Sequence, residues 1–378
     1  MLVVLTIKFF AMIYHVIGLM SGSSLDGLDI VFTELEESRG TWSYTIKAAD
    51  CYEYDTALKN GLFNAKNLSA YNYMLLHTSY GKYLAEKVNQ FIAENNLYHQ
   101  VQLIASHGHT VFHAPEFNMT SQLGDGATIA ALTEINVVSD LRNMDVALNG
   151  QGAPIVPMGE KLLFSDYDFY LNVGGIANIS FQTENNFIAY DVCSANAILN
   201  KLAQENNKDF DEDGNLAAAG KINTELLNKL NAFDYYQQPF PKSLSNEFGL
   251  NVVYPLIQSQ KININDALRT YTEHIAEQVF HSIELLLNEA QKNQTAYKLL
   301  ITGGGAFNTF LIEVLKEKLI AMNVEVFIPE PTVIKYKEAL IMALLGILRW
   351  REENTTLASV TGATRNSIGG TVWIGQEA

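Results

Sequence analysis

The chain has little cysteine and little positive charge, and each shortage excludes a class of protein. Only two residues are cysteines, Cys51 and Cys193, and they form neither a CxxC pair nor a zinc-type spacing with histidine. A disulfide framework is therefore excluded, which fits a reducing, cytoplasmic compartment. The 25 lysines and arginines are outnumbered by 41 aspartates and glutamates, which gives a net charge of −16. Such a surface repels nucleic-acid phosphates and anionic membranes, so we expect neither as a partner.

Long apolar runs are also scarce. The run Ala339–Leu348 is too short to span a bilayer, which takes about 20 residues, and it predicts a buried helix. The segment Met1–Met20 is apolar apart from Lys8 and His15. It lacks the basic start and the small-residue cleavage site of a signal peptide, and it leads directly into a glycine- and serine-rich loop. We therefore interpret it as a buried strand rather than a targeting segment, with Met12 as an alternative start.

The length and the alternation of elements predict two related α/β domains. At 378 residues, the chain is longer than one hydrophobic core usually holds. In each half, a strand, a glycine-rich turn and a return strand precede helices. The strands are expected at Tyr14–Met20 and Leu28–Leu35 in the first half, and at Asp168–Val173 and Phe187–Asp191 in the second. Apolar spacing predicts a helix over Ala70–Asn95. This pattern indicates an α/β fold with a cleft between two domains.

Further elements complete this expectation. Short strands are predicted at Val101–Ser106, Ile135–Ser139 and Lys298–Thr302, and a helix from about Asn308. The glycine- and proline-rich segment Gly150–Pro154 is typical of a hinge or crossover. We place the first domain at residues 1–140, with residues 345–378 packing back on it, and the second at residues 141–344.

The loop Gly18–Gly27 is the first candidate for binding chemistry. Its glycines allow close approach to an oxyanion, and its amides and hydroxyls can donate to a phosphate. The carboxylates of Asp26 and Asp29 can hold a magnesium ion. A tight turn capped by serine and aspartate would use the same residue types without any ligand. The loop alone leaves both interpretations open.

Two more glycine turns follow apolar strands, Gly174-Gly175 and Gly303-Gly304-Gly305. Each could be only steric relief at a corner. Ligands of α/β proteins bind at the carboxyl ends of strands, so three such turns could hold the phosphates and adenosine of a nucleotide. The chain contains neither GxxxxGK[ST] nor a complete GxGxxG, which excludes the P-loop and Rossmann classes.

Polar residues near these turns suggest roles in catalysis and binding. Asp191, at the end of its expected strand, can act as a general base on a water or hydroxyl, or can cap the helix expected from about Ala195. Arg142 can pair with an anionic substrate group or form a salt bridge in a surface turn. Glu338, at the start of an apolar helix, is either a partner of the helix dipole or a residue of the cleft.

Three histidines, His107, His109 and His113, raise the question of a metal site. Alternation places His107 and His109 on one face of a strand. No carboxylate lies at a typical ligand spacing, so we favour substrate contact or core hydrogen bonding.

Eleven segments resemble the anhydro-N-acetylmuramic acid kinase family, in order and over nearly the whole chain. They are GLMSGSSLDGLD (18–29), SHG-T (106–110), QLGDGATIA (122–130), VSDLRNMDV (138–146), NGQGAPIVP (149–157), LNVGGIANIS (171–180), DEDG (211–214), AAAGKIN (217–223), PKSL (241–244), GGGAFN (303–308) and VTGATRNSIGG (360–370).

The resemblance implies a fold of the actin and hexokinase type, with two RNase H-like domains closing over ATP and Mg²⁺. It implies that 1,6-anhydro-N-acetylmuramic acid, ATP and water give N-acetylmuramic acid 6-phosphate and ADP, in cell-wall recycling. The expected partner is thus a small amino sugar, and we also expect a homodimer.

The resemblance also assigns residues. Asp191 matches the aspartate that activates the attacking water. ATP binding is expected at Gly22, Ser23, Ser24, Leu25, Asp26, Gly27, Asp29, Gly174, Gly175, Asn178, Gly303, Gly304, Gly305 and Asn308. Substrate binding is expected at His107, Arg142, Asp145, Asn196 and Glu338, and magnesium binding through Asp26 or Asp191.

Four departures accompany the resemblance. Ser24 stands where the family usually has threonine, and His109 where glutamine is common. The usual Gly-Pro-Gly-Asn after the aspartate is Cys193-Ser194-Ala195-Asn196 here, and Asn200 replaces an aspartate. The altered loop bears on substrate detail and rate more than on the reaction class. A non-catalytic sugar- or nucleotide-binding regulator and a kinase for another amino sugar remain alternatives.

Overall fold

The computed structural model describes residues 11–22, 25–183, 186–240, 242–290 and 295–376. Predictions for residues 1–10, and for Ser23 and Ser24, therefore lie outside the described residues. The chain divides into two compact units, residues 1–164 with 336–378 (unit 1) and residues 165–335 (unit 2). Within the described ranges, no helix is both long enough and apolar enough to cross a membrane.

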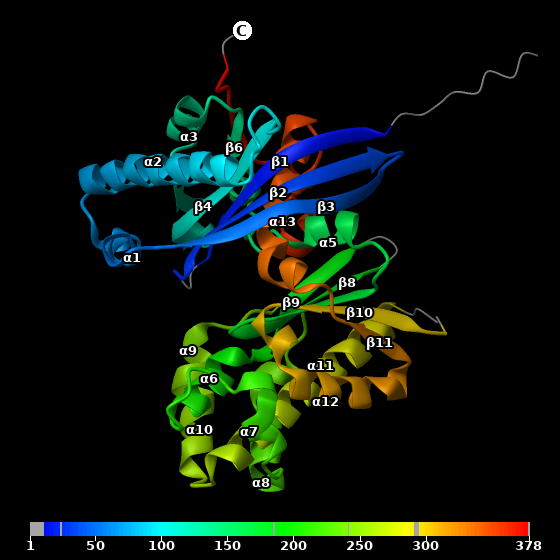
Figure 1. Cartoon of the computed structure of the whole chain (residues 1–378). Helices are drawn as coiled ribbons and strands as arrows, with labels where there is room; N and C mark the ends of the chain where they lie inside the picture. Colours follow the sequence, from blue (N-terminus) through cyan, green and yellow to red (C-terminus); the bar gives the residue numbers. More distant parts are fainter. Residues whose placement is uncertain (1–10, 23–24, 184–185, 241, 291–294, 377–378) are drawn as a thin grey trace, which may run out of the picture. The chain divides into compact units, whose positions relative to one another are not determined.

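Unit 1 is built on a seven-stranded sheet with the order β12-β6-β4-β1-β2-β3, in which β5 pairs with β4 (Figure 1). The first three strands form an antiparallel meander, whereas β4 runs parallel to β1, and β6 parallel to β4. The strands are β1 (Met12–Ser21), β2 (Gly27–Ser38), β3 (Thr41–Glu53), β4 (Leu103–Ala114), β5 (Met119–Leu123), β6 (Val137–Ser139) and β12 (Thr371–Trp373).

Side-chain alternation along β1 decides which helix covers each face of this sheet. Ile17 points into a core that it shares with α2 (Ala70–Glu94). The next residue, Gly18, would direct a side chain to the opposite face. A Cβ there would collide with the carbonyl group of Ala339, so α13 (Pro331–Trp350) packs directly on the strand. The other helices of unit 1 are α1 (Thr56–Phe63), α3 (Gly126–Thr133), α4 (Asn143–Ala147), α5 (Pro157–Leu163) and α14 (Ala358–Thr361).

Unit 2 is built on a five-stranded sheet with the order β11-β10-β7-β8-β9. Its core joins Phe169 and Leu171 of β7 to Tyr271 and Ile275 of the long helix α11 (Ile264–Ala290). The strands are β7 (Phe169–Val173), β8 (Ile176–Gln182), β9 (Phe187–Ser194), β10 (Tyr297–Thr302) and β11 (Val324–Phe327). The other helices are α6 (Asn196–Gln204), α7 (Asn215–Ala218), α8 (Thr224–Asn231), α9 (Asn246–Phe248), α10 (Tyr254–Ser259) and α12 (Thr309–Leu319).

The two sheets share one topology. In unit 2, β7, β8 and β9 form an antiparallel meander, and β10 and β11 follow β7 in parallel. This reproduces the arrangement of β1, β2, β3, β4 and β6 in unit 1. Three meander strands followed by two parallel strands is the RNase H-like order, so the expected fold of two related α/β domains is confirmed.

The unit boundaries differ from the expected domain boundaries. The expected division after residue 140 lies inside unit 1, because the following segment is bonded into that unit. The Asp145 carboxylate accepts hydrogen bonds from Gly152 and from Thr361 of the returning chain. The proposed hinge Gly150–Pro154 is therefore an internal part of unit 1. The chain returns to unit 1 at Tyr336 rather than at residue 345.

Element boundaries also differ in informative ways. Strands β3 and β8 were not expected, and β4 continues through His107 to Ala114 instead of ending before it. Gly108, with φ of 71°, lets β4 continue past a bulge in its pairing with β1. Strand β9 runs three residues beyond Asp191, and Ala195 caps α6. Capping of that helix by Asp191 is thereby excluded.

Candidate functional site

The first glycine-rich loop joins β1 to β2 in unit 1. The strands separate after the pair Ser21–Leu28. Leu25 adopts a positive φ of 58° and donates its N–H to the Gly22 carbonyl at 3.3 Å. A Cβ on Gly27 would lie 2.7 Å from the Tyr52 carbonyl oxygen, so only glycine fits against β3 at this position. The described part of the loop therefore depends on glycine at position 27, and Asp26 is exposed beside it.

Three carboxylates of unit 1 influence one another at this loop. Burial raises the pKa of Asp29 to about 6, and the negative charges of Glu338 and Asp26 raise it further against a hydrogen bond from the Cys51 thiol. Glu338 lies two turns into α13, which begins at Pro331, so the role of partner to the helix N-terminus is excluded. These three carboxylates are not arranged as a ligand set for a metal ion. Their negative charge beside a glycine turn would favour the approach of a cation, and oxygen anions are the ligands that Mg²⁺ prefers.

His107, which is buried, and Arg142, which is half-buried, form a hydrogen-bonded pair in the same unit. Arg142 donates from Nε to His107 Nε2 at 2.9 Å, and the other ring nitrogen lies 2.8 Å from the Gly108 carbonyl oxygen. Burial and the neighbouring guanidinium lower the pKa of His107 to about 3. Burial lowers the pKa of Arg142 to about 10, against the attraction of Glu338 and Asp145. At neutral pH the pair is therefore a neutral imidazole beside a cationic guanidinium, suited to an anionic group.

Asp145 has a different environment from the one expected. Its side chain is completely buried. One carboxylate oxygen accepts from the Gly152 N–H and the other from the Thr361 hydroxyl, both at 2.8 Å. This geometry gives Asp145 a structural role in holding the 149–154 segment, whose Gly152 carbonyl accepts a hydrogen bond from Arg142. Its contact with substrate stays a prediction.

A chain of buried hydroxyl groups ends at His109 and was not anticipated. The Tyr54 hydroxyl donates to Ser21 Oγ at 2.7 Å and lies 2.7 Å from the Tyr80 hydroxyl. Ser21 Oγ lies 3.1 Å from Nδ1 of His109. Ser21 immediately precedes the first loop, so this network fixes one end of the loop. No local pattern could have revealed it, because its members come from β1, α2, β4 and the loop that follows β3.

The histidines are used as hydrogen-bond partners. His113 Nδ1 lies 3.1 Å from the Thr120 hydroxyl, alongside the contacts of His107 and His109. Across the described part of the chain, no group of three or more His, Cys, Asp or Glu side chains is arranged to hold a metal ion.

In unit 2, three half-buried polar residues lie in register across three strands. Asn172 of β7 pairs with Asn178 of β8, which pairs with Asp191 of β9. Cross-strand partners share a face of the sheet, so these side chains form one polar row beside the second glycine turn. Asn172 was not among the expected site residues. The sequence feature that could have identified it is the polar Asn172 between Leu171 and Val173 in an otherwise apolar strand.

Asp191 is held by the backbone around it. Its Oδ2 accepts the Leu244 N–H at 2.8 Å, and its own carbonyl oxygen accepts the Tyr235 hydroxyl at 2.6 Å. Burial raises the pKa of Asp191, and the Leu244 N–H partly offsets the effect. Among the described residues, no donor reaches Oδ1. A fixed carboxylate with one uncommitted oxygen and a raised pKa has the features of a general base.

The second and third glycine turns meet at the end of β7. A Cβ on Gly303 would lie 2.8 Å from both Asn172 Oδ1 and the Val173 carbonyl oxygen, and Gly303 has a φ of 79°. Gly304 faces the Asn196 amide, which donates to the Val173 carbonyl oxygen at 3.1 Å. The backbone of Gly174 and Gly175 accepts from the first residues of α6.

Asn308 is partly committed to structure. Its side-chain oxygen caps α12 by accepting the Leu311 N–H at 3.0 Å. Gly214 of the DEDG segment packs against the same side chain, where a Cβ could not fit. The expected nucleotide contact of Asn308 must therefore use its remaining amide group.

Two RNase H-like α/β units, each with a glycine turn beside polar strand ends, define the class of sugar kinases and actin-like ATPases. The family model described as anhydro-N-acetylmuramic acid kinase matches residues 14–375. The chain belongs to the anhydro-N-acetylmuramic acid kinase family.

Curated relatives agree with this assignment. The anhydro-N-acetylmuramic acid kinase of Aliivibrio fischeri is 34% identical over 374 residues, covering 94% of this chain and 98% of the relative. The Francisella tularensis enzyme of that name is 33% identical, with 95% and 98% covered. Among solved structures, the activator of the 2-hydroxyisocaproyl-CoA dehydratase from Clostridium difficile with bound ADPNP is 13% identical. Its TM-score is 0.43, with 89% of this chain and 96% of that chain covered.

Proposed function

We propose that this chain is an ATP-dependent kinase that converts 1,6-anhydro-N-acetylmuramic acid and water to N-acetylmuramic acid 6-phosphate, in cytoplasmic cell-wall recycling. Family membership over residues 14–375 supports the reaction class. The observation that carries the chemistry is Asp191, whose carboxylate is anchored at Oδ2 and offers Oδ1.

The proposed reaction uses Asp191 as the base. A water molecule loses a proton to Asp191 Oδ1 as its oxygen bonds to the anomeric carbon of the sugar. The bond from that carbon to O6 breaks, and O6 takes the γ-phosphoryl group as the bond to ADP breaks. The raised pKa of Asp191 makes it a better proton acceptor than an exposed aspartate.

The glycine turns are proposed to bind ATP. The first loop, which contains Gly22, Leu25 and Gly27, offers backbone amides other than that of Leu25 to the phosphates, and the turns at Gly174 and Gly303 extend binding to the rest of the nucleotide. Magnesium would be held at Asp26, next to Asp29, and would neutralise phosphate charge. We assign this role to Asp26 rather than Asp191, because Asp26 is exposed beside the loop whereas Asp191 is needed as a base.

Substrate recognition is proposed for Arg142, His107, Glu338 and Asn196. The muramic acid carboxylate needs a cation, which Arg142 supplies in a site where His107 stays neutral. Glu338 can accept hydrogen bonds from sugar hydroxyl groups. Asn196 lies at the start of α6, beside the third glycine turn.

The direct test is turnover by the purified protein. With Mg-ATP and the anhydro sugar, we expect ADP release to depend on the sugar and one 6-phosphate product per ADP. Asp191→Asn should lower kcat by about a hundredfold or more while leaving ATP binding intact, because a general base contributes about 10²–10⁴ to the rate. Sugar-dependent thermal stabilisation without turnover would instead indicate a binding protein, and turnover of another amino sugar in a substrate panel would correct the substrate.

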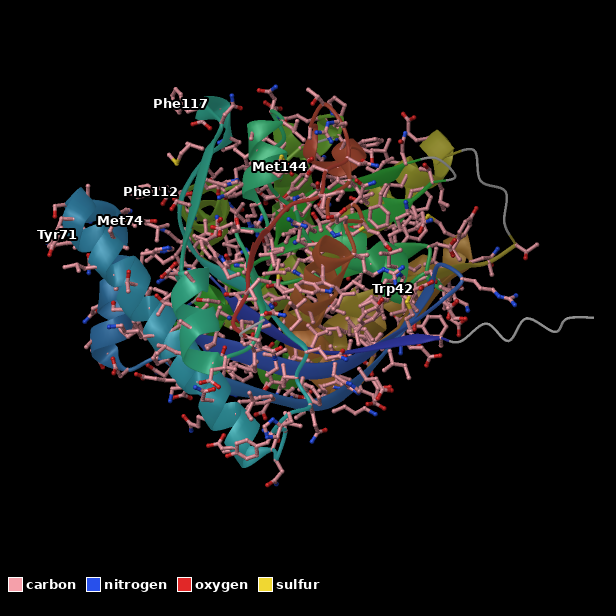
Figure 2. The ribbon with its side chains drawn as sticks, turned by 90° about the horizontal axis from the view of Figure 1, so that it is seen from above. Trp42, Tyr71, Met74, Phe112, Phe117 and Met144 are labelled. Carbon is pink, nitrogen blue, oxygen red and sulfur yellow. The ribbon has the colours of Figure 1, made fainter. Side chains whose placement is uncertain are left out.

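We also propose that the protein is a homodimer formed through an apolar surface of unit 1. The surface comprises Tyr71 and Met74 of α2 and Phe112 and Phe117 at the β4–β5 hairpin. Figure 2 shows these four side chains along one side of the molecule. Tyr71 is 73% exposed and Phe117 77% exposed, and Phe112 packs on Tyr73 of α2.

Charge favours a second copy as the occupant of this apolar surface. Residues 70–80 contain no Asp, Glu, Lys or Arg, and residues 109–123 contain only Glu116. Each copy has a net charge of −16, so the electrostatic repulsion between two copies is smallest when they meet through a surface with few charged residues. Light scattering should give a dimer for the wild type and a monomer for Met74→Asp/Phe117→Asp, while Tyr98→Asp, an exposed change elsewhere in the unit, stays dimeric. A wild-type monomer would contradict this proposal.

A further inference from the structure

A segment far from Asp191 in sequence forms a clamp around it. We call residues 235–240 and 242–244 the clamp segment, because Pro241 between them lies outside the described residues. It meets β9 at three points: the Asp191 N–H donates to the Lys242 carbonyl oxygen at 3.2 Å, the Leu244 N–H donates to Asp191 Oδ2 at 2.8 Å, and the Tyr235 hydroxyl donates to the Asp191 carbonyl oxygen at 2.6 Å. These hydrogen bonds hold both the backbone and the carboxylate of Asp191 in place. They therefore also set the orientation of its other carboxylate oxygen, Oδ1.

Lys242 ties the two ends of the clamp segment to each other. Its Nζ donates to the carbonyl oxygens of Tyr235 and Tyr236 at 3.2 and 3.4 Å. The same ammonium group lies 4.8 Å from the centre of the Tyr235 ring and 5.6 Å from that of Tyr190, which is a strand neighbour of Asp191. A cation over aromatic faces is attracted by the ring quadrupoles, so one side chain binds both the start of the segment and β9.

We propose that Lys242 is a positioning residue for the reaction: its ammonium closes the clamp segment, and the closed segment fixes the Asp191 carboxylate through the Leu244 N–H. The inference rests on the proposed role of Asp191 as the base. Lys242 itself need not touch the substrate. Without its cation, the segment loses its two carbonyl contacts and its hold on both rings, and the Leu244 N–H is no longer fixed against Oδ2.

The groups around Asp191 make its titration a clean readout of the clamp. Cys193 and Tyr235 interact electrostatically with Asp191. Tyr190 precedes Asp191 on β9, and the charged Lys242 lies over the rings of Tyr190 and Tyr235. Burial raises the pKa of Cys193 and of Tyr235, and that of Tyr190 to about 12, so all three are neutral near pH 7. Burial lowers the pKa of Lys242 from its ordinary value near 10.5. Asp191 is therefore the member of this group that titrates in the acid range.

The test compares Lys242→Met with Lys242→Arg and a matched control. Methionine keeps the apolar stem and removes the cation, whereas arginine keeps the cation and its ring contacts. Lys201→Met is the control, because Lys201 also lies over a tyrosine ring, that of Tyr254 at 5.8 Å, away from Asp191. For Lys242→Met we expect about a tenfold loss of kcat, an unchanged KM for ATP, and an acid limb of the kcat profile moved to higher pH. Lys242→Arg should recover most of the loss, and Lys201→Met should match the wild type.

A second readout separates this inference from the proposed function. The ¹³C titration of the Asp191 carboxyl group by NMR requires no turnover, and its midpoint should rise in Lys242→Met. An inactive wild type would contradict the proposed reaction, while an unshifted midpoint and acid limb would overturn the clamp. If Lys242→Met does not fold, Tyr235→Phe removes only the hydroxyl that holds the Asp191 carbonyl, and it must move the midpoint in the same direction.

Discussion

Asp29 and Asp191 are both half-buried aspartates whose pKa burial raises, yet their neighbours give them different chemistry. Asp29 faces the carboxylates of Glu338 and Asp26, so its charge is disfavoured until a cation arrives. Asp191 faces the Leu244 N–H, which stabilises its charge and fixes one oxygen. The first environment suits metal binding and the second suits proton transfer.

The ionised Asp29 carboxylate should lower the stability of the folded protein while it supports Mg-ATP binding. Its folded pKa of about 6 lies above the unfolded value of 3.8, so the folded state binds more protons between these values. Stability therefore falls as the pH rises through this window. Asp29→Asn should raise the free energy of unfolding of the metal-free protein at pH 7.5 by about 1 kcal/mol, allowing for partial exposure, with no gain below pH 4. It should also weaken Mg-ATP binding.

Thermal unfolding in EDTA at the two pH values measures this effect of Asp29. Glu53→Gln is the control, because Glu53 is an exposed carboxylate on β3. Equal changes in the two variants would mean that the crowding of carboxylates around Asp29 costs no stability.

His274 should make unit 2 sensitive to acid. It is fully buried between Asn231 and the Tyr236 hydroxyl, and burial lowers its pKa to about 3. The unfolded chain, with a histidine pKa near 6.5, binds the proton first, so stability falls as the pH drops from about 6.5 towards 3. The loss is about 1.4 kcal/mol per pH unit from this group.

Urea unfolding at pH 7 and pH 5 tests the role of His274. In His274→Gln we expect the pH-dependent loss to shrink by about 2 kcal/mol, although the variant starts less stable. His281→Gln, an exposed change on the same helix, should keep the wild-type pH dependence. An unchanged slope in His274→Gln would show that this imidazole is protonated in the folded state.

At the scale of elements, the glycine turns work through close approach as much as through conformational freedom. Gly27, the first residue of β2, lies against the backbone of β3. Gly305 lies against Val173, where a Cβ would collide with the valine side chain. These contacts connect each turn to the strand beside it. A turn that is displaced from its strand also displaces the groups that it presents to a phosphate.

Gly27→Ala should therefore impair nucleotide binding. The new Cβ would lie 2.7 Å from the Tyr52 carbonyl oxygen and 2.8 Å from Cys51 Sγ, so β2 or β3 must shift. We expect the KM for ATP to rise about tenfold or more, because small displacements of positioning groups have large kinetic effects. Gly61→Ala in α1 is the control, since its Cβ meets nothing closer than 3.8 Å and alanine favours a helix. Steady-state kinetics that leave the KM of Gly27→Ala unchanged would remove this loop from ATP binding.

At the scale of the whole molecule, unit 2 is one continuous segment inserted into unit 1. Residues 165–335 form a unit with its own core, whereas unit 1 needs residues 336–378 to complete its sheet and cover one face. Helix α13 supplies the fully buried run from Ala339 to Leu345, and β12 pairs with β6. Each large apolar side chain in this run contributes about 1.5–3 kcal/mol when buried.

Fragments should reproduce this organisation. Residues 165–335 expressed alone should unfold cooperatively on heating, with helical circular dichroism. Residues 1–164 alone should not, because they lack α13 and β12. Cooperative unfolding of the 1–164 fragment would show that the returning chain is dispensable to unit 1.

The sequence by itself predicted the class of fold, the positions of the glycine turns, and Asp191 as a candidate base. Alternation predicted the hairpin strands, apolar spacing predicted α2, and ordered motifs predicted the family. These features are local, since a strand, a helix or a turn is encoded by residues within a few positions of each other. The expected domain boundary after residue 140 differs from the boundary of unit 1 after residue 164. Contacts that help to define this unit, such as the hydrogen bond from Thr361 to Asp145, join residues far apart in the chain.

Only the tertiary structure decided the partners of each functional side chain. It committed Asp145 to a structural role, brought Tyr54 and Tyr80 to Ser21, and placed Leu244 on Asp191. These contacts depend on the packing of separate elements, and one residue type can serve several roles until its neighbours are known. The direction in which burial and neighbouring charges move a pKa depends on that packing as well.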